Sequence, residues 1–359
     1  MSEQRRLDAV RSQLEQRGLY AHLVTSIINV RYITGFTGST GTAVITPDAA
    51  VMLVDSRYTL QASNECPLFE IKQFSGNIMT AAAELLNEMG AERVGFEECG
   101  VTYDQYTSLC RGLQVGKQLV PSGEIIDQLR LVKDEEEISL IRKAVEIADL
   151  CFSDLLTWLV PGIPERDIAL RLEVCMRQHG AEKPAFDSIV AVGPHAALPH
   201  AQPGDAMTEA GQLVKLDYGA QYHLYPSDIT RTIALGKATA KQKEIYQIVL
   251  DAQLAAIDAI RAGIPGRDID AVARAIIEEK GYGENFGHGL GHSLGLGVHD
   301  GPGLSQTSNV VLEPGMVMTV EPGIYIEGWG GIRIEDDVVV TESGCEILSK
   351  SPKMELLVL

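Results

Sequence analysis

The sequence predicts an α+β fold in which a small α/β domain precedes a larger, duplicated domain. Residues 1–120 combine one amphipathic helix with short strand-like runs. Beyond them, a seven-residue motif at Gly162–Ile168 recurs at Gly263–Ile269, and a β-hairpin pattern follows each copy. Such self-similarity indicates two copies of one supersecondary unit. The simplest packing is a pseudo-twofold pair, with the hairpins forming a sheet and the helices on its outside.

In the small domain, apolar residues from Leu7 to Leu14 keep helical spacing. We expect a loop at Asn29–Gly38, with polar and aromatic side chains, and a connector at residues 121–132 before a second domain at residues 133–359. The predicted strands of the small domain are Ala21–Val24, Thr42–Thr46 and Val51–Val54.

In the second domain, each copy of the repeated motif lies between two helical patterns. The same order of elements around both copies makes a chance match of seven residues improbable. The four predicted helices are Glu135–Trp158 and Arg166–Gly180 in the first half, then Lys241–Arg261 and Arg267–Gly281 in the second.

Composition excludes several classes of function. The net charge of −19 argues against a nucleic-acid surface and against an anionic membrane face. No apolar run approaches the ~18 residues of a membrane span, and the polar start does not resemble a signal peptide. Six scattered cysteines without a C-x-x-C pair are typical of reduced thiols, so we expect a cytoplasmic protein.

The two predicted hairpins each carry a pair of carboxylates. A turn centred between residues 222 and 223 would place Asp217 opposite Asp228, and a turn near Gly328 would place Glu321 opposite Glu335. Like charges that face each other across a hairpin are destabilising. Two such pairs, at equivalent places in the repeat, therefore require a compensating cation.

A histidine-rich segment lies between the hairpins. Phe286–Asp300 contains His288, His292 and His299 together with five glycines, which let the backbone approach a bound ion or substrate closely. His292 can add a neutral nitrogen ligand to the four carboxylates, whose charge two divalent ions would cancel. Oxygen-rich ligand sets favour hard ions, Mn²⁺ first, with Co²⁺, Fe²⁺ and Zn²⁺ as alternatives.

These residues resemble a known metal set. The order Asp217, Asp228, His292, Glu321, Glu335, with Val-Glu-Pro-Gly around Glu321 and Gly-Ile-Arg-Ile-Glu-Asp around Glu335, resembles the methionine aminopeptidase, aminopeptidase P and prolidase family of pita-bread metallopeptidases. Residues 1–120 resemble the creatinase-like N-terminal domain of its proline-directed branch. Creatinases share this fold but lack the ligands, all five of which are present here.

The resemblance implies a role for each ligand. Asp228 and Glu335 would bridge two metal ions, Asp217 would bind one ion, and His292 and Glu321 would complete the other. A hydroxide that bridges the ions would attack the scissile carbonyl. Glu321 would also shuttle the proton to the leaving nitrogen.

Four further residues are expected around the reaction. His299 would stabilise the oxyanion, and Arg333, which shares a strand face with Glu335, would orient that carboxylate or the substrate. By resemblance, His200 would contact the substrate beside the leaving proline, and His288 would face the substrate or support a ligand.

The resemblance leaves the substrate open. By resemblance, strict dipeptidases of this family hold the terminal carboxylate of the substrate with an arginine a few residues after the last histidine. The segment His299–Asn309 offers no such cation. We therefore expect an Xaa-Pro aminopeptidase that acts on small peptides with proline in the second position. An Xaa-Pro dipeptidase is the alternative, with Arg31 or Arg57 as the clamp. A catalytically silent peptide-binding protein of the same fold is a third interpretation. A homodimer is expected from the family.

Overall fold

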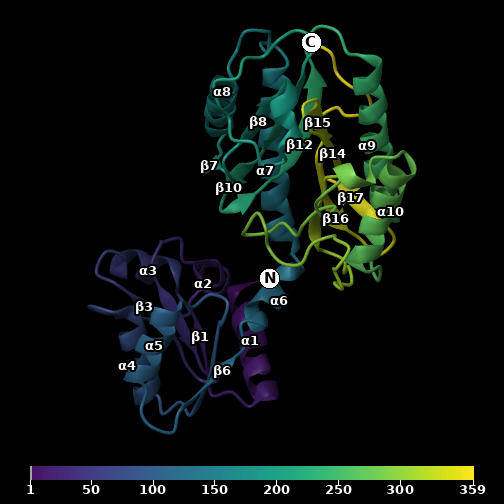
Figure 1. The fold of residues 1–359 in the computed structure, drawn as a ribbon. Coiled ribbons are helices and arrows are strands. Elements are labelled where there is room, and N and C mark those ends of the chain that lie inside the picture. Colours follow the sequence, from purple (N-terminus) through teal and green to yellow (C-terminus); the bar gives the residue numbers. More distant parts are fainter. Residues whose placement is uncertain (1) are drawn as a thin grey trace. The chain divides into compact units, whose positions relative to one another are not determined.

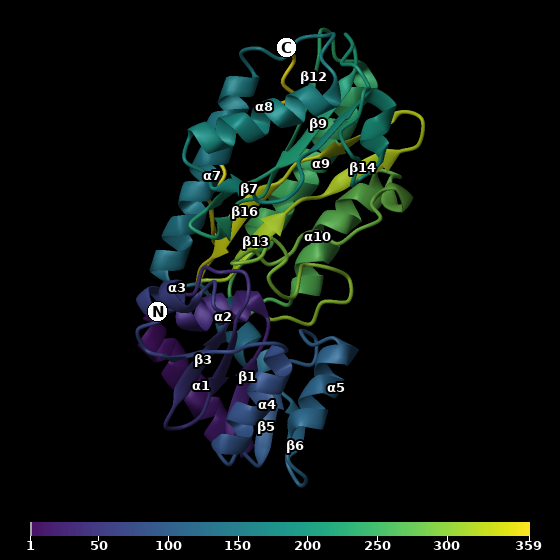
Figure 2. The ribbon, with the colours of Figure 1, turned by 90° about the vertical axis from the view of Figure 1, so that its left-hand side faces the viewer.

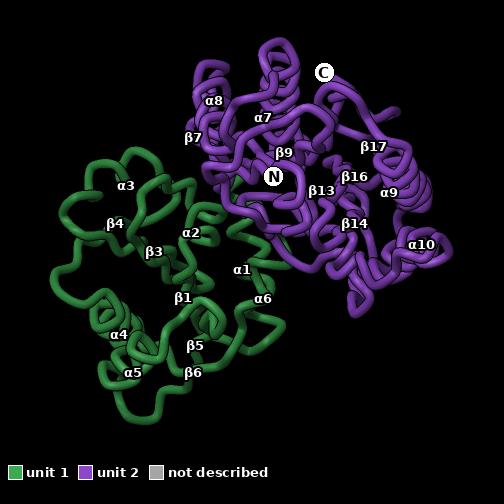
Figure 3. The backbone as a smooth tube through the Cα atoms, turned by 45° about the horizontal axis from the view of Figure 1, so that its top comes forward, with its two compact units in different colours: residues 1–130 green, residues 131–359 purple. Residues whose placement is uncertain are grey.

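The computed structural model describes residues 2–359, which form two compact units that divide after Arg130 (Figure 3). Helix α6 (Glu124–Leu131) occupies most of the segment that we expected to be a connector. Each unit has its own core and is described by itself.

The first unit is built on a six-stranded mixed sheet with strand order β4-β3-β2-β1-β5-β6. The three predicted strands are present as β1, β2 and β3, and β1 pairs antiparallel with β2 and parallel with β5. The strands are β1 (Ala21–Val24), β2 (Thr42–Ile45), β3 (Ala50–Val54), β4 (Glu70–Gln73), β5 (Arg93–Phe96) and β6 (Gln118–Pro121).

Helices cover this sheet on two sides, with α4 and α5 on one face and α1 on the other (Figures 1 and 2). Apolar residues of α4 and α5 pack against β1, β2, β3 and β5 in one core cluster, and Leu7, Val10 and Leu14 of α1 are buried as predicted. The helices are α1 (Glu3–Arg17), α2 (Ile27–Thr34), α3 (Thr59–Glu65), α4 (Ile78–Glu88) and α5 (Tyr103–Gly112).

Our prediction of a loop at Asn29–Gly38 is wrong, because helix α2 occupies most of this segment. Two features favour the helix. The backbone N–H groups of Thr25 and Ser26, at its start, donate to the carboxylate of Glu97, as does the side-chain amide of Asn29. The helix ends at Gly35, whose φ of 77° only glycine adopts without strain.

A buried histidine in β1 predicts acid sensitivity. His22 is fully buried, and burial lowers its pKa from 6.5 to about 4. The unfolded chain therefore binds a proton that the folded chain does not, so stability falls as the pH falls from 6.5 towards 4. We expect His22→Leu to gain roughly 2 to 3 kcal/mol of unfolding free energy relative to wild type between about pH 7.5 and 4.5.

Urea unfolding of the wild type and of His22→Leu, both with a chelator present and at several pH values, measures this difference. All other titrating groups are common to both, so they cancel. A free-energy difference that does not change with pH would contradict the predicted pKa.

The second unit contains the predicted duplication. The helices of the first half, α7 (Glu135–Leu155) and α8 (Glu165–Gln178), pack on one side of the strands, and those of the second half, α9 (Ala240–Ala259) and α10 (Gly266–Glu279), pack on the other (Figure 1). The strands are β7 (Lys183–Pro184), β8 (Ile189–Val192), β9 (Leu213–Tyr218), β10 (Ala220–Tyr222), β11 (Tyr225–Pro226), β12 (Ile229–Ala234), β13 (Val317–Val320), β14 (Gly323–Ile326), β15 (Gly330–Arg333), β16 (Asp336–Val340) and β17 (Cys345–Ile347), with short 3-10 helices at Gly193–Ala197 and Gly283–Asn285.

The repeated motif has the same structure in both halves. The N–H of Gly162 donates to Thr208 and that of Gly263 donates to Leu312, at 2.7 and 2.8 Å. Both glycines have positive φ, 94° and 83°. The sequence repeat therefore reflects a repeated chain reversal before α8 and before α10.

The register of the first hairpin differs from our prediction. Asp217 faces Thr230, because the turn lies one residue later, at His223 and Leu224. Both turn residues have positive φ, 45° and 71°, which is the geometry of a two-residue hairpin turn. Asp228 therefore lies two residues away from the position directly opposite Asp217.

The register of the second hairpin agrees with our prediction. The pairs Val320–Asp336 and Gly323–Arg333 flank the position at which Glu321 faces Glu335. The two hairpins meet where the N–H of Glu335 donates to the carbonyl of Thr230 at 3.1 Å. No helix of residues 2–359 has the length and apolar composition needed to cross a membrane.

Candidate metal centre

The four predicted carboxylates and His292 converge between the two hairpins. Ligand atoms of Asp228, His292 and Glu335 lie within 4.8 Å of one another. His292 Nε2 is 3.5 Å from Asp228 Oδ2 and 3.5 Å from Glu321 Oε1. Asp217 lines the same cavity. The structure therefore brings together two acids from the first half and three ligand residues from the second.

Burial and mutual repulsion disfavour the charged form of the carboxyl groups in this cluster. Burial, and then the neighbouring carboxylates, raise the pKa of Asp228 and of Glu335 well above their ordinary values. Burial raises the pKa of Glu321 to about 7. The Oδ1 atoms of Asp217 and Asp228 are buried without a hydrogen-bond partner. Buried, unpaired acceptors of this kind fit divalent cations with oxygen ligands.

His292 is suited to be a neutral ligand. Burial lowers its pKa to about 4, and the ring of His299, whose centroid is 4.1 Å away, adds to this effect. A neutral imidazole offers a lone pair to a metal ion. Its backbone N–H donates to Thr319 Oγ1, whose hydroxyl in turn donates to Glu321 Oε1 at 3.2 Å, so one threonine positions two ligands.

Arg333 forms hydrogen bonds with residues of both hairpins. Its guanidinium donates to Asp217 Oδ2, to Thr230 Oγ1 at 2.9 Å and to the hydroxyl of Tyr325 at 2.7 Å. Tyr325 also contacts His288 Nε2 at 3.0 Å. Our sequence analysis missed Tyr325. It follows Glu321 by four residues, and residues an even number apart along a strand lie on the same face of the sheet.

Two adjoining cavities of about 290 and 300 Å³ open onto the cluster and share His200, His292, His299, Glu321 and Arg333. His288 and Ser305 line the first, and the remaining acids line the second. All nine predicted site residues line at least one of them: Asp217, Asp228, His200, His288, His292, His299, Glu321, Arg333 and Glu335.

The loop that carries His200 is held by two buried charged residues that sequence reasoning missed. Lys215 Nζ donates to the carbonyls of Ala196, Leu198 and Pro199. Glu165 binds the other side of the loop and accepts from the N–H groups of Val192 and Gly204 and from His195 Nδ1. Lys215 shares a strand face with Asp217, which is the signal that could have indicated it.

Comparison with known proteins matches both parts of the chain. Residues 139–342 match the metallopeptidase family M24, and residues 6–132 match the creatinase/prolidase N-terminal domain. The chain is 38% identical to an Xaa-Pro dipeptidase of Pyrococcus furiosus, over 98% of this chain and 99% of that protein.

Solved structures are also similar to this chain over nearly its whole length. A structure described as an Xaa-Pro dipeptidase from Bacillus anthracis has a TM-score of 0.96 and 43% identity, and covers all of both chains. An X-Pro aminopeptidase from Thermotoga maritima has a TM-score of 0.87 and 39% identity, over 95% of this chain and 98% of that chain. The chain therefore belongs to metallopeptidase family M24, with a creatinase-type N-terminal domain before a pita-bread domain.

Proposed function

We propose that this protein is a metal-dependent Xaa-Pro dipeptidase. The observation that carries the proposal is the buried cluster of four carboxylates and His292, onto which two adjoining cavities of about 290 and 300 Å³ open.

The donor set fits two divalent ions, Mn²⁺ first. Asp228 and Glu335 would be shared between the ions, Asp217 would bind one, and His292 and Glu321 would bind the other. When bound, such ions supply a Lewis acid for the scissile carbonyl and lower the pKa of a bound water.

The side chains of this unit would handle protons and position the substrate. Glu321 accepts a proton from the attacking water and passes it to the proline nitrogen. His299 donates to the developing oxyanion. His200 and His288 line the cavity and contact the substrate, while Arg333 orients Asp217 and Tyr325.

We favour the dipeptidase, which was the alternative from the sequence, over the aminopeptidase. The lack of a cation after His299 had favoured the aminopeptidase. Relatives and solved structures described as Xaa-Pro dipeptidases support the dipeptidase across nearly the whole chain, although one similar structure is described as an aminopeptidase. Cytoplasmic location and a homodimer stay predictions.

A time course on Ala-Pro, Ala-Pro-Ala and Ala-Ala-Ala, with Mn²⁺ or with chelator, tests the proposal. We expect Mn²⁺-dependent cleavage of Ala-Pro and little release of alanine from the tripeptides. Efficient release from Ala-Pro-Ala would select the aminopeptidase. No cleavage of any peptide would favour a silent binding protein.

The loop with His200 gives a prediction on substrate affinity. Lys215→Met keeps the length of the side chain but leaves three carbonyls without their buried donor, at a cost of about 1 to 3 kcal/mol. We expect KM for Ala-Pro to rise roughly tenfold, with a smaller change in kcat, because His200 loses its fixed position. Steady-state kinetics measure this, and the exposed Lys237→Met is the matched control. An unchanged KM would contradict the role of this loop.

A further inference from the structure

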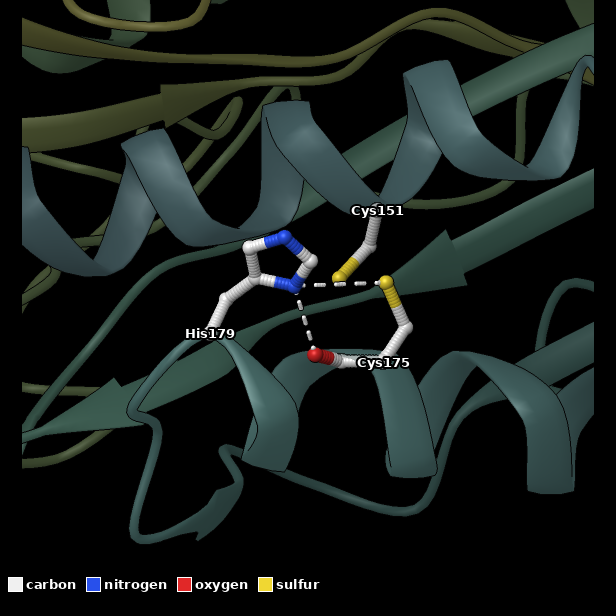
Figure 4. Close-up of side chains that lie close together, drawn as sticks. All are labelled: Cys151, Cys175 and His179. Carbon is white, nitrogen blue, oxygen red and sulfur yellow. Dashed lines mark hydrogen bonds between the residues drawn. The ribbon is translucent and has the colours of Figure 1, made fainter.

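A second cluster of metal-ligating side chains lies in the first half of the second unit. Cys151 is in the last turn of α7, Cys175 is in α8, and His179 follows directly at the end of α8. Cys175 and His179 are four residues apart, so they lie on the same side of the helix. Figure 4 shows the two sulfur atoms and the imidazole of His179 converging between the helices.

The spacing of these atoms suits a small cation. The two sulfur atoms and the imidazole nitrogen lie within 4.8 Å of one another, and Cys175 Sγ is 3.6 Å from His179 Nδ1. A tetrahedral ion with bonds of about 2.3 Å to sulfur and 2.0 Å to nitrogen holds such a pair of ligands roughly 3.5 Å apart. One edge of the coordination polyhedron is therefore already formed.

The chemistry of the ligands differs from that of the carboxylate centre. Two sulfurs and one nitrogen are soft and borderline donors, which select thiophilic ions over Mn²⁺. Both thiols are buried, and burial raises the pKa of each, while the nearby carboxylate of Asp154 raises both further.

The cluster also has a route from solvent. His179 is exposed, whereas both cysteines are buried. Its Nδ1 lies 2.9 Å from the carbonyl oxygen of Cys175, so this nitrogen carries the proton in the metal-free protein. Binding at Nδ1 would require this proton to move to Nε2 and the hydrogen bond to the carbonyl to break.

We propose that Cys151, Cys175 and His179 form a separate site for a thiophilic cation of the Zn²⁺ class. Binding would release one proton from each thiol to solvent, so the ion and two thiolates form a neutral group that suits a buried position. Water would complete the fourth coordination position. The ion would link α7 to α8. The proposed site does not depend on the proposed peptidase activity.

Cobalt absorption distinguishes this site from the carboxylate centre. The full-length protein is titrated with Co²⁺ under a reducing agent that does not bind metal, and the near-ultraviolet sulfur-to-cobalt charge-transfer band is recorded. We expect the band at saturation to correspond to one sulfur-bound Co²⁺ per chain, while Co²⁺ at the carboxylate centre adds no such band, and we expect Zn²⁺ to remove the band. The band should persist in Asp228→Asn, because no cysteine lies at the carboxylate cluster.

Variants assign the band to its ligands. Cys175→Ser should abolish it, and His179→Gln, at an exposed position, should weaken Co²⁺ binding at least tenfold with the circular dichroism unchanged. Cys345→Ser is the matched control: this thiol donates a hydrogen bond to the carbonyl of Ile257 and lies outside the cluster, so the variant should leave the band intact. No band in the wild type, a band in Cys175→Ser, or unchanged affinity in His179→Gln would overturn the proposal.

Discussion

Replacement of Glu335 by glutamine is expected to lower Xaa-Pro hydrolysis at least about 100-fold, because even an outer partner of a metal ligand is worth 10- to 100-fold. Glu335 is buried and accepts from Thr230 Oγ1 at 2.6 Å. Glutamine keeps that acceptor and the shape of the side chain, but it removes one of the four charges proposed to hold the ions. Metal content, measured on dialysed protein, should fall together with activity.

The same variant should be more stable than the wild type when both are free of metal. The pKa of Glu335 is raised in the folded chain, so the folded state binds more protons than the unfolded state above pH 4.5. Stability of the metal-free wild type therefore falls as the pH rises through this range, and glutamine removes that loss. Urea unfolding in chelator at pH 7 measures the gain.

The exposed Glu342→Gln serves as the control for both measurements. A Glu335→Gln protein that keeps full metal content and activity would rule out Glu335 as a ligand. Lower stability in chelator would show that its carboxylate is not the unfavourable buried charge described above.

Replacement of Glu321 by glutamine is expected to lower kcat on Ala-Pro by about 10² to 10⁴. The amide can still offer an oxygen to a metal ion, but it cannot accept the proton of the attacking water. Because Glu321 is also a proposed ligand, kcat is measured at saturating Mn²⁺ with metal content determined in parallel. Activity within tenfold of the wild type at full metal occupancy would assign the proton transfer to another group.

A matched control lies on the same hairpin. Glu327 is an exposed acid at the turn, six residues after Glu321. Glu327→Gln should leave kcat and metal content unchanged. A comparable loss in Glu327→Gln would indicate an effect of net charge on the unit, and would remove the specific role of Glu321.

The second hairpin was predictable because its turn is marked by glycine. Gly328 has a φ of 72°, and counting outward from it places Glu321 opposite Glu335. The first hairpin turns at His223 and Leu224, which have positive φ although neither is glycine or asparagine. Tertiary contacts decide that turn, so sequence alone gave a register in error by one residue at the turn.

Two of the residues missed at the site, Lys215 and Glu165, act mainly through the backbone of other segments. Lys215 donates to a loop more than 15 residues upstream, and Glu165 joins both ends of that loop. Most of their partners are peptide groups, which carry no signal in the side-chain sequence. The metal set was accessible because its members are charged side chains at equivalent positions in a duplicated unit.

The division of the carboxylates between the two halves has a consequence for folding. Asp217 and Asp228 come from the first copy, and Glu321 and Glu335 come from the second. Neither copy by itself can gather the charge that a pair of divalent ions requires. Ions that bind the assembled protein and not the unfolded chain shift the equilibrium towards assembly. Metal bound at this proposed centre would therefore stabilise the second unit by linking its two halves, and the stabilisation would rise with the free metal concentration.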